Sequence, residues 1–82
     1  MTKIAYSVSL IDGNSIIGVA SKLFIKDVNT ILTISDHHAP LVGTLSHGSV
    51  VVYDLEGASK EYGFEDAFLN CHDNTVTLTV LN

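Results

Sequence analysis

Apolar and polar residues alternate one by one at both ends of this 82-residue chain. Near the start, every second residue of the segment 4–10 is apolar, and near the end Val76, Leu78 and Val80 alternate with threonines. A two-residue period places one set of side chains on each face of a β-strand. Val, Ile and Thr, whose branched side chains favour strands over helices, make up 23 of the 82 residues. Both terminal segments are therefore predicted to be strands.

Turn signals divide the rest of the chain into short segments. Asp12-Gly13-Asn14 is typical of a hairpin, because an Asp-Gly pair accepts the positive φ angles of primed turns. Further breaks follow at intervals of roughly ten residues, and no segment keeps a helical period long enough to predict a helix. These breaks lie at Asp27-Val28-Asn29, Asp36-His37, Ser46-His47-Gly48, Leu55-Glu56-Gly57 and His72-Asp73-Asn74.

The spacing predicts an all-β fold, namely a two-layer antiparallel β-sandwich of about eight to ten short strands. A chain of this length has room for one domain, which we expect to cover residues 1–82. The alternating apolar positions are the expected core: Ile4, Tyr6, Val8, Val50, Val52, Phe68, Val76 and Leu78.

Charge and composition exclude several classes of function. Nine acidic residues against four basic ones give a formal charge of −5, which disfavours binding to nucleic acid or to anionic lipid. The chain begins without a signal-peptide pattern, and no apolar run approaches the ~20 residues of a spanning helix. The single cysteine, Cys71, fits a reducing compartment, and we expect it to be a core residue.

No pattern in the chain is typical of catalysis. Asp36-His37-His38, with His47 and His72 elsewhere, could supply metal ligands. Neighbouring residues on a strand face apart, however, and no paired metal-ligand spacing is present, so turn and surface histidines are the better interpretation. The same geometry argues against a nucleophile formed by Cys71 and its neighbour His72. We expect a non-catalytic protein without cofactors.

The segment from Ile31 to Gly48 resembles the epsilon subunit of F-type ATP synthases, the equivalent of the mitochondrial delta subunit. Leu32-Thr33-Ile34, His38-Ala39-Pro40-Leu41-Val42, Leu45 and Gly48 match that family's pattern without a gap. Weaker matches near Gly18 and over residues 67–77 extend the resemblance to most of the chain. The chain departs from the pattern where Asp36-His37 replaces Pro-Gly, His47 replaces Pro and Asp66-Ala67 replaces Gly-Gly.

The resemblance implies a rotor subunit that clamps the gamma subunit and rests on the ring of c subunits; in a bacterium such a subunit would lie at the cytoplasmic face of the inner (plasma) membrane. Positions that approach gamma in the family correspond to Leu10, His38 and Gly43, and the contact is expected to extend over 38–44, with Leu41 included. Positions that approach the c ring correspond to Asn29, Thr30 and Ile31, where Ile31 replaces a usual acidic residue.

Typical family members continue into a helical hairpin that can inhibit ATP hydrolysis and can bind ATP, and this chain stops where their sandwich ends. We therefore expect neither property of the 82 residues. A second hypothesis is an adaptor that binds some other protein through an exposed strand or sheet face. A third, the least favoured, is a small metal-dependent enzyme.

Overall fold

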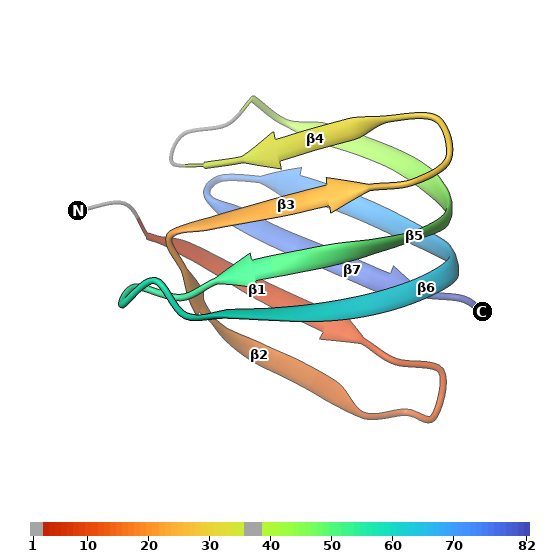
Figure 1. Ribbon diagram of the computed structural model, residues 1–82, viewed down its shortest axis with the longest axis horizontal. Helices are drawn as coiled ribbons and strands as arrows, with labels where there is room; N and C mark the ends of the chain where they lie inside the picture. Colours follow the sequence, from red (N-terminus) through yellow and green to blue (C-terminus); the bar gives the residue numbers. More distant parts are fainter. Residues whose placement is uncertain (1–2, 36–38) are drawn as a thin grey trace.

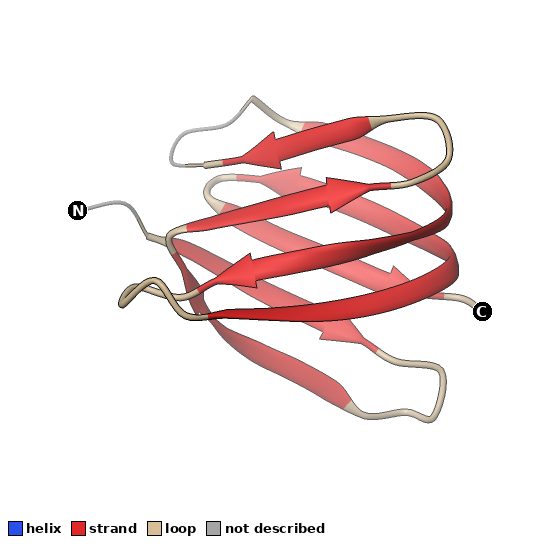
Figure 2. Cartoon of the chain, viewed as in Figure 1, coloured by secondary structure: helices blue, strands red, loops and turns tan. Residues whose placement is uncertain are grey.

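The computed structural model describes residues 3–35 and 39–82, and within them every regular element is a strand (Figure 2). The prediction of an all-β fold is thus confirmed. Seven strands follow one another: β1 (Ile4–Ser9), β2 (Ser15–Ala20), β3 (Lys22–Lys26), β4 (Ile31–Ile34), β5 (Leu41–Tyr53), β6 (Ser59–His72) and β7 (Thr75–Val80).

The strands form one continuous sheet in the order β2-β1-β7-β6-β5-β3-β4. All neighbouring pairs are antiparallel except β1 and β7, which pair in parallel from Ala5↔Thr75 to Ser9↔Thr79. A wholly antiparallel sheet was the wrong expectation here. Short turns force consecutive strands to run in opposite directions, whereas β1 and β7 are joined only through the rest of the chain and are under no such constraint.

Two long strands account for the difference between the predicted number of strands and the seven observed. The turn signal at Ser46-His47-Gly48 does not end a strand, because β5 runs through it for 13 residues. Strand β6 likewise runs for 14 residues, through Asp66-Ala67, where the family pattern has two glycines. Both strands pair with each other along almost their whole length.

A corner bends both long strands at the same level. In β5 the buried apolar side chains are Leu45 before it and Val50 and Val52 after it, so the two-residue period changes phase. His47 stands at this point with a φ of 45°. Its partner strand changes phase at Glu65 and Asp66, two consecutive exposed residues. Strands that pass from one layer of a β-structure to another bend in this way.

Gly48 makes the corner possible. A Cβ at this position would overlap the carbonyl oxygen of Lys26, at the end of β3. Only glycine lets the two backbones approach so closely. Proline, which the family has in place of His47, cannot adopt a φ of 45°, so the corner of this chain differs locally from the family pattern.

Bending brings the two parts of the sheet face to face: in Figure 1, β3, β4 and the green and teal parts of β5 and β6 lie in front, and β7 and β1 lie behind. Instead of two separate layers, a single curled sheet encloses one core to which every strand contributes. Its largest fully buried side chains are Ile4, Val8, Leu23, Ile25, Ile34, Val50, Leu69, Cys71, Val76 and Leu78.

Six of the eight predicted core residues are buried, namely Ile4, Val8, Val50, Val52, Val76 and Leu78. Tyr6 is half-buried and packs against the core. Phe68 was predicted wrongly, since its side chain is 38% exposed. The corner is the physical reason: after the phase change, Ala67, Leu69 and Cys71 point inward and Phe68 between them points outward. Cys71 is buried, as expected.

Candidate functional site

The loop between β3 and β4 is held by one carboxylate. The Oδ1 atom of Asp27 accepts hydrogen bonds from the backbone N–H groups of Asn29 (2.9 Å) and Thr30 (2.8 Å). Its Oδ2 atom accepts a third from Ser46, at the corner of β5 (2.9 Å). Hydrogen bonds to the ionised form, from Ser46 foremost, hold the pKa of Asp27 below its ordinary value. The loop is therefore a fixed structure tied to the corner.

Apolar side chains project from this loop. Val28 is 66% exposed, and Ile31, the first residue of β4, is 69% exposed, so Ile31 does not point into the core. Asn29 and Thr30 between them are exposed as well. The three residues that the resemblance assigns to the c ring thus lie together on one accessible loop.

The same end of the molecule carries a further apolar region, in which Ile11 is exposed. An open depression of about 560 Å³ lies between the turn after β1, the corner and the C-terminal residues. Leu10, Ile11, Phe64 and Val80 line it, together with polar groups that include Asp12 and Glu65. We call this region the corner end; in Figure 1 it includes the β3–β4 loop and the β1–β2 turn on the right.

A second depression continues the corner end toward the β3–β4 loop. It is lined by Asp27 and Val28 and shares His47 and Gly48 with the first. Ile11 is 64% exposed in the one region and Val28 66% exposed in the other. The corner end is consequently an apolar surface with acidic groups at several points, suited to contact through area more than through ion pairs.

The residues assigned to gamma are not gathered into one cluster. Leu10 follows β1 and lines the depression at the corner end. Leu41 and Gly43 belong to β5, and β7 and β6 lie between β5 and β1 in the sheet. Leu41 is half-buried and packs against the core, whereas a Cβ at Gly43 would meet no atom within 4 Å. His38 lies outside the described residues.

The histidines do not form a metal site within residues 3–35 and 39–82, where no group of three or more His, Cys, Asp or Glu side chains could hold an ion. Asp36, His37 and His38 lie outside these ranges. His47 stands at the corner, and His72 lies at the end of β6.

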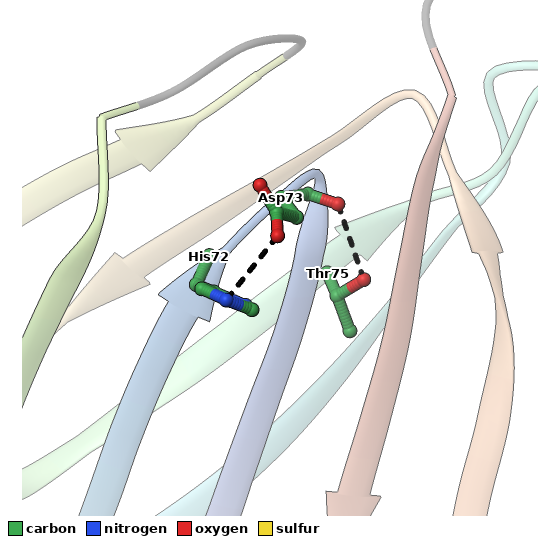
Figure 3. Close-up of polar contacts among 3 residues, drawn as sticks. All are labelled: His72, Asp73 and Thr75. Atoms are coloured by element: carbon green, nitrogen blue, oxygen red, sulfur yellow. Dashed lines mark hydrogen bonds and ion pairs between the residues drawn. The ribbon is translucent and has the colours of Figure 1, made fainter.

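Figure 3 shows His72 beside Asp73, with its Nε2 atom 3.2 Å from a carboxylate oxygen, at the exposed β6–β7 turn. The Thr75 hydroxyl donates to the Asp73 carbonyl at 3.3 Å. Asp73 and Asn74 both have positive φ values, as the central residues of a type I′ turn do. These contacts explain a tight turn and need no ligand.

The side chains of Cys71 and His72 point to opposite faces of β6, so they do not form a shared site. Its thiol is buried in the core, and burial raises its pKa. A thiol in such surroundings stays protonated and is a weak nucleophile.

Sequence reasoning missed the apolar residues Ile11 and Leu81 at the corner end, both exposed. Each is a lone apolar residue beside a turn or a strand end, and periodicity carries no information about such positions. The signal that could have found them is that neither residue has an apolar neighbour two positions away along the chain.

Among the described residues no helix could span a membrane. In comparisons with known proteins, the sequence matches no protein-family model and no curated protein.

Proposed function

We propose that this chain is a non-catalytic subunit of the central stalk of an F-type ATP synthase, coupling a gamma subunit to the ring of c subunits. The observation that carries the proposal is the gap-free resemblance over Leu32–Gly48, a segment that contains most of β4 and the first part of β5. The exposed apolar loop at Asn29–Ile31, where the resemblance implies a contact with the ring, adds support.

A coupling subunit must transmit torque without deforming. Packed cores resist compression, and this chain has one core shared by all seven strands. The long paired strands β5 and β6 bind both parts of the sheet together, so a load applied at the corner end is carried through backbone hydrogen bonds. No reactive group is needed for this task.

The placement of the assigned residues supports two separate contacts. The β3–β4 loop would rest on the c ring, and the start of β5 would contact gamma. In this proposal Leu10, at the end of β1, extends the gamma contact around the corner end, because Leu41 and Gly43 lie three strands away from it.

An adaptor for another protein is the second candidate. It is favoured by the same exposed apolar residues, since Val28, Ile31 and Ile11 form a surface that any apolar partner could cover. The two candidates differ in the identity of the partner, which binding measurements can decide.

The deciding experiment measures binding of the purified chain to a gamma subunit by co-purification and titration. Gly43→Glu should weaken gamma binding at least tenfold while leaving the unfolding midpoint nearly unchanged, because a side chain at this position meets open space. Ser59→Glu is the control, since Ser59 is an exposed residue at the start of β6 and does not line the depression that Leu10 lines.

Failure of the unaltered chain to bind gamma would leave the adaptor as the better proposal. Equal losses of binding in the Gly43→Glu and Ser59→Glu variants would instead show that the start of β5 is not the contact.

A further inference from the structure

Strand β2 forms an edge of the sheet, where within the described residues it pairs only with β1. Leu10 N–H donates to the Asn14 carbonyl at 2.8 Å, and in an antiparallel ladder every second residue pair exchanges such bonds. Residues 16, 18 and 20 therefore direct their backbone groups toward β1. Ser15, Ile17 and Val19 direct their N–H and C=O groups away from it, along the open edge.

This edge has none of the usual protection against pairing. Natural edge strands are commonly guarded by charged side chains, proline or a bulge. Strand β2 reads Ser-Ile-Ile-Gly-Val-Ala, without charge or proline, and its register with β1 is unbroken from Ile4↔Ala20 to Ser9↔Ser15. The opposite edge, β4, is shorter, with four residues.

The side chains of β2 divide cleanly between the two faces. Ile17 and Val19 point outward and are 77% and 43% exposed. On the inner face Ala20 is buried and Ile16 packs against the core. The Tyr6 ring covers Gly18 so closely that a Cβ there would lie 2.8 Å from the Tyr6 hydroxyl. The inner side is thus already packed, and only the edge and the outer face remain open.

We propose that β2 pairs antiparallel with β2 of a second copy of this chain, extending the sheet across a two-fold axis at Gly18. The outer faces of the two copies form one continuous face of the extended sheet only if the exposed residues of one β2 strand lie opposite the exposed residues of the other. With Gly18 on the axis, Ile17 of each copy faces Val19 of the other. Shifting the axis to Ile17 or to Val19 places an apolar side chain opposite a serine, Ser15 or Ser21, instead.

Charge favours the same arrangement. Asp12 precedes β2 in the hairpin turn, and Lys22 follows it at the start of β3. An antiparallel pair brings the acidic end of one strand to the basic end of the other, whereas a parallel pair would place like charges together. Thus the net charge of −5 does not gather at the contact.

A pair of six-residue strands buries less area than the ~1,200–2,000 Å² of stable complexes, so the dimer is a weak one whose population rises with the concentration of the chain. The proposal concerns the chain on its own and does not depend on the function proposed above. The proposed contacts at the β3–β4 loop and at the start of β5 lie on other strands than the edge of β2, and of the residues assigned to the rotor only Leu10 lies beside β2, at the turn that precedes it.

The first test follows the mass of the chain by sedimentation from about 10 µM to 1 mM, a range chosen to span weak association. The mass should rise from 8.8 kDa toward twice that value. Ile17→Lys should keep the chain monomeric throughout, because a charge then stands at the edge. Val42→Lys is the matched control, since Val42 is 62% exposed on β5 and far from the edge, and it should leave association unchanged.

The second test fixes the register. In a Cys71→Ser background, Ile17→Cys combined with Val19→Cys should give a disulfide-linked dimer, because directly opposed strand residues lie within bonding distance. Either substitution alone should give none, since diagonal neighbours lie about 7–8 Å apart. A chain that stays monomeric at every concentration, or a dimer that persists in the Ile17→Lys variant, overturns the proposal. A dimer linked by a single cysteine overturns the register.

Discussion

Asp27 links the loop at the corner end to the strand beside it. Three backbone N–H groups, from Asn29, Thr30 and Ser46, donate to its two carboxylate oxygens. The backbone adds to this link, because Val28 N–H donates to the Ser46 carbonyl at 3.2 Å. One exposed carboxylate therefore fixes the loop that the proposed function assigns to the c ring.

The pH dependence of stability should reflect this carboxylate. Its pKa is lower in the folded chain than in the unfolded one, so the ionised group stabilises the fold above the unfolded value. That contribution is lost as the pH falls below about 4 and through the folded pKa. Asp27→Asn should lower the unfolding midpoint at pH 7 and remove this part of the acid sensitivity, as urea unfolding at pH 2–7 would show.

Glu61→Gln is the control for this experiment, because Glu61 is an exposed acid on β6 away from the loop. An Asp27→Asn variant that kept the full acid sensitivity of the unaltered chain would show that the hydrogen bonds of Asp27 contribute nothing to folding.

At the scale of elements, the corner of β5 and β6 decides which residues face the core. The clean alternation of β1 and β7 is visible in the sequence, and Ile4, Val8, Val76 and Leu78 could be assigned from it. The corner could not be predicted from the sequence, because Ser46-His47-Gly48 has the composition of a turn between two strands and instead forms a bend inside one strand. The position of Phe68 depends on that phase change, which tertiary contacts set and local pattern does not.

His47 allows a test of the corner. With a φ of 45°, it lies in the left-handed region, where a β-branched residue is strongly disfavoured. His47→Val should therefore destabilise the chain by about 1–2 kcal/mol, while His47→Gly should be neutral or stabilising. Chemical denaturation with both variants measures the difference. Equal stabilities would mean that the left-handed conformation at His47 does not hold the corner.

For the whole molecule, four of the six described large apolar side chains that are at least 60% exposed lie at one end, and the other two, Ile17 and Val42, lie on β2 and β5. Ile11, Val28, Ile31 and Leu81, each at least 60% exposed, lie at or beside the corner end. The turn between β5 and β6, at the left in Figure 1, is instead organised by the Asp54 carboxylate, which accepts hydrogen bonds from Glu56 and Ala58 N–H groups. The sequence predicted a turn at Asp27-Val28-Asn29. That this loop lies at the same end of the molecule as Ile11 and Leu81 is set by the three-dimensional fold and could not be predicted from local pattern.

A crosslinking experiment separates the two ends by function. Thr30 is exposed in the β3–β4 loop, and Glu56 is exposed in the turn at the opposite end. In a Cys71→Ser background, Thr30→Cys should form a disulfide with a cysteine placed in the c-subunit loop of the assembled enzyme, whereas Glu56→Cys should form none. The bond should form equally well at low and high salt, because the loop offers Val28 and Ile31 as contact area and an apolar contact is not screened. If gamma still binds normally and cysteines at positions 27–31 all fail to crosslink, the c ring does not dock on this loop.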